Sequence, residues 1–362
     1  MATIPLLYSC DDHLDFGAVP PDLFETRLPA NLRERGPRVV ERDGARVWVA
    51  DDRVIGTSGS NPTYSAIARA GIDDPDGSRA SDPKRRLEDM DRDHLQVSVI
   101  YGPHALGMPI DDADLKAACL GAWNDWAIDF NQVAPQRLCI LAFLPGHEPA
   151  AAAKELERAA RAGHRGAILD IFDMDLGDPA WDLLWAAAAD TQLPISFHLK
   201  GGASSLTWQP GSWKSAAFAT VAPMQLDEGL ATMVFSGALD RHPGMRLVLA
   251  ESGIGWIPYF VARMDLEWKG YRDKIDVSLS VPPSEIFKRQ VYATFEEESL
   301  GEKLIPLLGA DHFMWASDYP HPDSTFPRSV DAVDEALGGL PESDRRKITA
   351  ENCANLYGFE LI

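Results

Sequence analysis

The stretch Phe313-Met314-Trp315-Ala316-Ser317-Asp318-Tyr319-Pro320-His321 decides the fold of this chain. It is an apolar run of strand length that ends in a carboxylate and an imidazole. The start of the chain repeats this order, because residues 6–10 run into Asp11-Asp12-His13. Only a closed fold makes the first and last strands neighbours. A parallel barrel does so, and it carries its chemistry at the carboxyl ends of the strands.

Further apolar runs of strand length lie between these two stretches, and segments with helical spacing separate many of them. The predicted strands are 97–102, 139–145, 166–171, 194–199, 246–250 and 290–295, and the predicted helices are 113–131, 149–162, 178–190 and 230–241. This alternation predicts parallel strands joined by right-handed crossovers. No Gly-x-Gly-x-x-Gly follows the first strand, which weakens the case for a doubly wound sheet. We therefore expect an α/β fold, a distorted (β/α)8 TIM barrel in one domain over residues 1–362.

Three segments are too long to be simple connections, and we expect them to be insertions after strands one, five and six. They are residues 14–96, 200–229 and 265–289, and a helix is expected at the C-terminus. The first insertion should contain a hairpin over residues 45–55 and a polar loop over residues 56–83. Long loops on the catalytic face of a barrel usually cover the substrate.

The composition excludes several classes of partner. The chain of 362 residues has a formal net charge of −21, so we expect neither nucleic acid nor an anionic membrane as a partner. The four cysteines, Cys10, Cys119, Cys139 and Cys353, have no metal-binding or disulfide spacing. The first residues have no basic region and no long apolar run, so we expect no signal peptide and a cytoplasmic location.

Four side chains that bind hard metals fall at predicted strand ends on one face of the barrel: Asp11, His13, His198 and Asp318. Two imidazoles and two carboxylates are a suitable ligand set for one divalent ion, with Zn²⁺ the first choice and Fe²⁺ or Mn²⁺ as alternatives. Taken singly, His198 could equally be a core histidine bonded to a backbone carbonyl. The shared placement of the four residues favours the metal.

Glu251 ends predicted strand six and brings another carboxylate to the same face. It either moves protons beside the metal or serves structure by pairing with an arginine or capping the next helix. Further residues follow predicted strands or lie in the insertions and are candidates for the pocket wall. These are His104, His147, Trp208, Trp213 and His321.

These motifs resemble the amidohydrolase-related family, in the branch of aminocarboxymuconate-semialdehyde decarboxylase. The strings that carry the resemblance are Asp-Asp-His at 11–13, Glu-Ser-Gly-Ile-Gly-Trp-Ile-Pro at 251–258 and Ser-Asp-Tyr-Pro-His at 317–321. The resemblance implies a metal-dependent barrel in which Asp11, His13, His198 and Asp318 hold one divalent ion. Many relatives begin with His-x-His where this chain has Asp11-x-His13. Decarboxylases often have a catalytic histidine where this chain has Glu251.

The presence of Glu251 in place of that histidine favours hydrolysis as the reaction. In this interpretation the metal activates a water, Asp318 handles its proton, and Glu251 or His198 assists. The substrate would be a small apolar or aromatic carboxylic compound cleaved at an amide, an ester or thioester, or an activated C–C bond. The alternative is non-oxidative decarboxylation of an aromatic or unsaturated acid, with Asp318 protonating the ring carbon. A third hypothesis is a barrel that binds a ligand without a metal and without catalysis, and the intact set of metal ligands argues against it. We also expect a homodimer.

Overall fold

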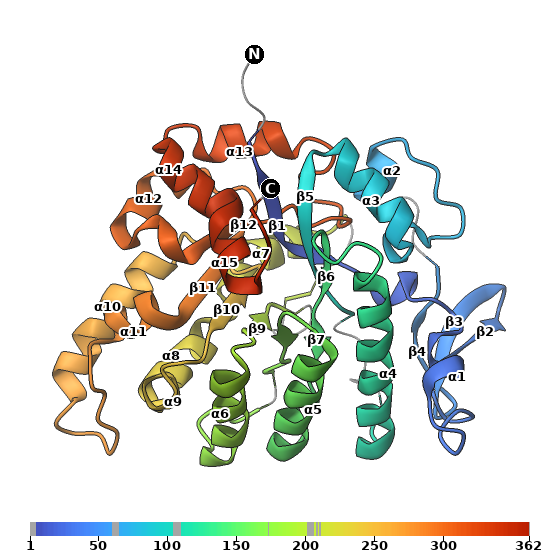
Figure 1. Cartoon of the computed structure of the whole chain (residues 1–362), viewed down its shortest axis with the longest axis horizontal. Coiled ribbons are helices and arrows are strands. Elements are labelled where there is room, and N and C mark those ends of the chain that lie inside the picture. Colours follow the sequence, from blue (N-terminus) through green and yellow to red (C-terminus); the bar gives the residue numbers. More distant parts are fainter. Residues whose placement is uncertain are drawn as a thin grey trace.

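The fold is taken from a computed structural model that describes residues 5–59, 65–103, 110–172, 174–200, 206–207, 209 and 211–361. His104 and Trp208, two of the predicted pocket residues, lie outside the described residues. Figure 1 shows helices arranged around a set of strands whose first and last members, β1 and β12, lie together at the centre of the view.

The central strands are parallel and form one closed series. They are β1 (Leu7–His13), β5 (Leu95–Tyr101), β6 (Leu138–Ile140), β7 (Ala142–Phe143), β8 (Ala167–Ile168), β9 (Ile195–His198), β10 (Leu247–Ala250), β11 (Val291–Phe295) and β12 (Phe313–Trp315). β6 and β7 are two parts of one strand. The amide of Leu141 between them donates to Ile100 O at 3.0 Å and so keeps the strand beside β5.

Backbone hydrogen bonds beyond the end of β12 close the barrel. Asp318 N donates to Asp11 O at 2.9 Å, and His13 N donates to Tyr319 O at 2.6 Å. The first and last strands are thus neighbours, as the end sequences predicted, and the distorted TIM barrel is confirmed. All seven residues of β1 are buried, although four of them, Ser9, Asp11, Asp12 and His13, are polar or charged.

Asp12 explains how so polar a strand end is buried. Its carboxylate accepts hydrogen bonds from Ser9 Oγ at 2.7 Å, from Tyr319 N at 3.2 Å and from Ser98 Oγ, and Arg86 Nη2 lies 3.6 Å away. A buried charge is tolerated only when it is paired and hydrogen-bonded in this way. Asp12 therefore ties β1 to β5 and to the segment after β12, and it fixes the positions of its neighbours Asp11 and His13.

Helices cover the outside of the barrel. They include α4 (Ala113–Asn131), α5 (Pro149–Ala162), α6 (Asp182–Thr191), α8 (Asp227–Phe235), α9 (Ala238–Arg241), α10 (Ile257–Tyr271), α11 (Pro283–Gln290), α12 (Gly301–Leu308), α13 (Ser329–Leu337), α14 (Glu342–Arg346) and α15 (Asn352–Tyr357). The helices predicted at 113–131 and 149–162 match α4 and α5. The predicted helix at 230–241 is instead two helices. Gly237, at φ +78°, separates α8 from α9.

The insertion after β1 forms a small layer beside the barrel. It contains α1 (Leu23–Arg27), an antiparallel sheet of β2 (Arg38–Arg42), β3 (Ala45–Ala50) and β4 (Arg53–Thr57), then α2 (Ala66–Arg69) and α3 (Pro83–Arg92). The predicted hairpin is therefore part of a three-stranded sheet. The predicted loop at 56–83 holds α2, which the Ser65 hydroxyl caps at Ala68 N.

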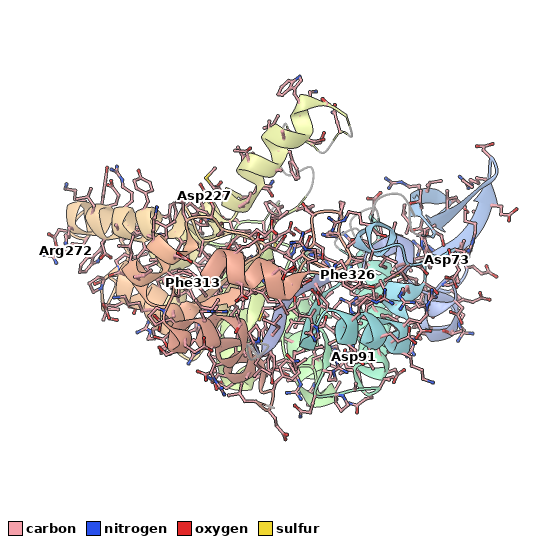
Figure 2. All side chains as sticks on the ribbon, turned by 90° about the horizontal axis from the view of Figure 1, so that it is seen from above. Asp73, Asp91, Asp227, Arg272, Phe313 and Phe326 are labelled. Carbon is pink, nitrogen blue, oxygen red and sulfur yellow. The ribbon has the colours of Figure 1, made fainter. Side chains whose placement is uncertain are left out.

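One helix of the insertion after β9 stands away from the barrel. Figure 2 shows α7 (Trp213–Val221) projecting from the body of the molecule, and none of its residues is buried. None of the helices in the described part of the chain has both the length and the apolar character needed to span a membrane.

Candidate metal centre

The carboxyl ends of β1, β9 and the segment after β12 bring the four predicted ligands together. His13 Nε2 lies 3.0 Å from Asp318 Oδ1 and 3.5 Å from Asp11 Oδ1. His198 Nε2 lies 3.4 Å from the same Asp11 oxygen. Each residue thus presents one atom toward the point around His13 Nε2, where the atoms form two overlapping groups: Asp11, His13 and His198 in one, and His13, Glu251, Asp318 and His321 in the other.

Glu251 reaches the same point from the end of β10. Its Oε2 atom lies 3.1 Å from His198 Nε2 and 3.7 Å from His13 Nε2. Glu251 and Asp318 both have positive φ angles, +50° and +59°. Such backbone is costly for residues other than glycine and tends to persist at functional sites. Both carboxylates are therefore turned toward the centre at some cost in local free energy.

The atoms at this point fit a divalent cation. Ligand atoms on one ion lie about 3 to 3.5 Å apart when each bond is near 2.1 Å, and the spacings of His13 and His198 to Asp11 and of His13 to Asp318 agree with this. Among the described residues, the buried oxygens Asp11 Oδ1 and Asp318 Oδ1 accept no hydrogen bond of good geometry. His198 Nδ1 lies 2.7 Å from Leu199 O, where it can donate, and this leaves the lone pair of Nε2 facing the centre.

A threonine that the sequence patterns did not single out supports two of these carboxylates. Thr294 Oγ1, on β11, donates to Asp11 Oδ2 at 2.8 Å and accepts from Glu251 N at 2.7 Å. One hydroxyl therefore sets the orientation of Asp11 and the start of the turn that carries Glu251. Partners of this kind orient metal ligands and tune their affinity.

The charges at the centre strongly affect one another. Burial opposes a charged imidazole, but the carboxylates of Asp11 and Glu251 outweigh it and raise the pKa of His198 to about 9. Burial also acts against the charge of Asp318, yet His321 and His13 lower the pKa of this carboxyl to about 2. Burial and the nearby Asp318 raise the pKa of Glu251 to about 8. In the absence of a cation, protons on these groups balance the excess of carboxylates.

The structure places His321 beside the centre as well. Its Nδ1 atom lies 3.0 Å from Asp318 Oδ2, and its Nε2 atom lies 3.4 Å from Asp15 Oδ2. Its ring stacks on that of His13 with centroids 3.9 Å apart. His321 therefore links Asp318 to Asp15 and covers one face of His13.

Two cavities flank the centre. One of about 310 Å³ lies over the ends of β10 and β11, with Glu251 in its wall. The other, of about 240 Å³, lies on the side of the insertion and is lined by residues that include Asp15, Ile67 and His321. The centre thus faces the substrate-sized space expected at the carboxyl ends of barrel strands.

Two other predicted pocket residues lie elsewhere. His147 is exposed in the turn before α5, and Trp213 is 72% exposed at the start of α7. Neither lines the two cavities beside the centre. The apolar composition of the insertion suggested a pocket wall, but Trp213 is on the outer part of the projecting helix.

The sequence also contains a signal for a residue that was not among the predicted site residues. Glu296 directly follows the apolar strand β11 and lines the larger cavity. The rule that selected Asp11, Glu251 and Asp318, a carboxylate at the end of an apolar run, selects Glu296 too. Thr294 carries no comparable signal, because it is a small polar residue inside a strand.

A family model described as an amidohydrolase matches residues 44–359, which is most of the chain. The chain therefore belongs to the amidohydrolase family, and the resemblance found in the motifs is confirmed. Among curated proteins, gamma-resorcylate decarboxylase of Rhodococcus jostii is 27% identical over 302 residues, which cover 76% of this chain and 87% of that protein.

Solved structures of related enzymes share the fold. The 5-carboxyvanillate decarboxylase LigW of Sphingomonas paucimobilis superimposes with a TM-score of 0.71 at 20% identity, over 99% of this chain and 100% of that one. A dihydroxybenzoic acid decarboxylase of Polaromonas, solved with bound manganese, superimposes with a TM-score of 0.62 at 20% identity, over 83% and 94% of the two chains. At these identities the likeness concerns the fold.

Proposed function

We propose that this protein is a metal-dependent decarboxylase that releases CO2 from an aromatic carboxylic acid without an oxidant. The observation that carries the proposal is a group of candidate metal ligands, which includes Glu251, next to a cavity that Glu251 also lines. The decarboxylase relatives in the same family support it. The preference for hydrolysis that the sequence suggested is set aside in favour of the alternative named there.

The argument for hydrolysis rested on an ionised Glu251, since an ionised carboxylate cannot readily donate the proton that a carbanion needs. With no cation bound, burial and the neighbouring Asp318 raise the pKa of Glu251 to about 8, which weakens that premise. Glu251 is also the carboxyl group that a ligand in the larger cavity would meet. Asp318, by contrast, is 1% exposed and held between His13 and His321.

These positions give the residues distinct roles. Asp11, His13, His198 and Asp318 would hold the cation, whose charge would bind the substrate carboxylate and an adjacent oxygen. Glu251 donates a proton to the ring carbon that bears the carboxylate. The bond from that carbon to the carboxylate breaks, its electron pair returns to the ring, and CO2 leaves. Glu251 is left ionised and regains a proton from water.

The choice of metal and the homodimer remain predictions. A set rich in carboxylate oxygens suits Mn²⁺ as well as the Zn²⁺ expected from the sequence. Elemental analysis of the purified protein measures the metal, and sedimentation equilibrium measures the number of chains.

The reaction is tested with metal-loaded protein and a panel of hydroxylated benzoic acids. We expect at least one acid to yield CO2 and the parent phenol, and we expect a chelator to abolish this. Hydrolysis is the second candidate because Glu251, 3.1 Å from His198, is also placed to accept a proton from a water molecule. An ester or amide turned over by a protein that decarboxylates none of the acids would favour it.

A further inference from the structure

The insertion after β1 reaches back to the metal centre through one buried arginine of α3, Arg86. This residue is 1% exposed, and its Nη1 atom donates to His13 O at 3.0 Å. Its Nη2 atom donates to Ser98 Oγ at 3.3 Å and lies 3.6 Å from Asp12 Oδ2. Its guanidinium also lies over the ring of Tyr319, 4.9 Å from the centroid. A single side chain of the insertion thus contacts β1, β5 and the segment after β12.

Tyr319 provides a second link between α3 and the centre. It directly follows Asp318 in the chain, and its hydroxyl donates to Asp89 Oδ2 of α3 at 2.6 Å. Arg79 holds the same carboxylate with two hydrogen bonds, from Nε at 2.7 Å and from Nη2 at 2.9 Å. The backbone carbonyl of Tyr319 accepts from His13 N at 2.6 Å. The side chain of Tyr319 is therefore anchored in the insertion, while its backbone is paired with a candidate metal ligand.

The buried charges of this network balance. Arg79 pairs with Asp89 and Arg86 with Asp12, and each of the four residues is at most 8% exposed. Replacing buried ion pairs by well-packed apolar side chains often costs no stability, so stability alone gives little reason to keep them. The network does provide a fixed geometry, because charge-assisted and bidentate hydrogen bonds hold directions as well as distances.

We propose that Arg86 and Tyr319 are positioning residues through which α3 of the insertion sets the geometry of the metal centre. They hold the backbone segments that carry His13 and Asp318, whose facing atoms lie 3.0 Å apart. Neither side chain belongs to the candidate ligand groups, so each acts through one of these two ligands. The inference rests on the proposed function only for the presence of a cation, and it holds for any reaction at that cation.

Cobalt-loaded protein tests the inference without turnover, because the visible absorption of Co²⁺ reports the arrangement of its ligands. Arg86→Lys keeps the charge but lacks the planar group that reaches His13 O and Ser98 Oγ together. Tyr319→Phe removes only the hydroxyl bonded to Asp89. We expect each variant to change the absorption spectrum and to weaken Co²⁺ binding by about tenfold, the lower end of the range for partners that orient metal ligands. Affinity is measured by competition with a chelator.

Two control variants make the same substitutions away from the centre. Arg165→Lys changes an arginine that also donates to a backbone carbonyl, Tyr357 O at 2.9 Å, and lies over an aromatic ring, that of Phe359, 4.5 Å from the centroid. Tyr8→Phe removes a hydroxyl on β1 that donates to Glu360 O at 2.6 Å. Both controls should lose thermal stability but keep the wild-type spectrum and affinity.

An unchanged spectrum and affinity in either Arg86→Lys or Tyr319→Phe would overturn the inference. Equal changes in the two controls would also overturn it, since they would show a general effect of lost stability. If Arg86→Lys does not fold, Tyr319→Phe decides alone, because it leaves every buried charge in place.

The same measurements separate this inference from the proposed function. Variants that bind Co²⁺ like wild type, in a protein that releases CO2 from an aromatic acid, would refute the inference and support the proposed function. Changed spectra in a protein that decarboxylates no acid would support the inference and count against decarboxylation. Wild-type protein that binds no Co²⁺ would contradict both.

Discussion

The histidines at the two ends of the barrel strands differ in their partners. At the carboxyl ends, His13 and His198 contact the carboxylates of Asp11 and Glu251. Before the starts of strands, His164 Nε2 lies 3.1 Å from Asn124 O, and His312 Nδ1 lies 2.9 Å from Val291 O. One residue type therefore serves two purposes within one fold.

The electrostatic consequence is opposite at the two ends. Burial lowers the pKa of both His164 and His312, so these imidazoles stay neutral and act as hydrogen-bonding parts of the core. The carboxylates around His198 overcome burial and raise its pKa to about 9. The density of carboxylates at one end of the strands, rather than the histidines themselves, creates the demand for a cation.

The largest expected effect comes from removing one histidine at each end. His198→Ala should lose most of its metal and at least about a thousandfold of its activity, because a bound cation supplies several kcal/mol of charge stabilisation. His312→Ala should keep its metal and lose stability only. Metal content, activity and thermal unfolding are measured for both. Full metal occupancy in His198→Ala would contradict the claim that the histidines at the carboxyl ends of the strands bind the metal.

A smaller effect separates two carboxylates of the centre, Glu251 and Asp318. Glu251→Gln should lower turnover by about a hundredfold or more, the usual contribution of a positioned proton donor, while keeping the metal. Asp318→Asn should also lower turnover by about a hundredfold or more, but it should weaken metal binding as well, since Asp318 faces both His13 and His321. Near-normal turnover in metal-loaded Glu251→Gln would show that another group supplies the proton.

Thr294→Val tests the support behind the ligands. The variant removes the hydroxyl that donates to Asp11 and accepts from Glu251 N, and it keeps a β-branched residue in the strand. We expect metal affinity to fall by about tenfold, the lower end of the range for such partners. Thr191→Val, which removes a hydroxyl bonded to Ala187 O at the end of α6, is the control and should bind metal normally. Unchanged affinity in Thr294→Val would contradict this role.

The smallest expected effect concerns a buried carboxyl away from the centre. Burial raises the pKa of Asp93, just before β5, to about 7, and Ser329 N and Oγ donate to its carboxyl. The unfolded chain has the ordinary, lower pKa, so the folded state loses stability as pH rises from about 4 to about 7. Asp93→Asn cannot ionise. It should gain thermal stability relative to wild type over that range, by about 2 °C at pH 8. A difference that does not depend on pH would refute the assignment.

The candidate metal ligands could be selected from the sequence because the signal for each of them is local. An apolar run followed by Asp or His marks a strand end, and a closed barrel brings all such ends to one face. Asp11, His13, His198 and Asp318 could therefore be grouped from the order of the residues alone. The same rule reached Glu251 and also applies to Glu296.

Other features depend on tertiary contacts that no local pattern contains. Burial of Glu251 beside Asp318 raises the pKa of Glu251. The sequence alone led us to expect an ionised carboxylate, as for an isolated glutamate, and the preference for hydrolysis followed from that expectation. Thr294 acts through two hydrogen bonds to residues distant in the sequence. Trp213 was a pocket candidate by composition alone, and only the direction of α7 shows that it lies on the outside.

The most direct test of decarboxylation follows the carboxyl carbon and the proton in one experiment. Metal-loaded protein is supplied in D2O with hydroxylated benzoic acids labelled with ¹³C in the carboxyl group. We expect ¹³CO2 to appear in equal amount to a phenol that carries one deuterium at the carbon that lost the carboxylate. The account is contradicted if every labelled acid keeps its carboxyl group while the same protein, in water labelled with ¹⁸O, transfers that oxygen to the acid product of an ester or amide.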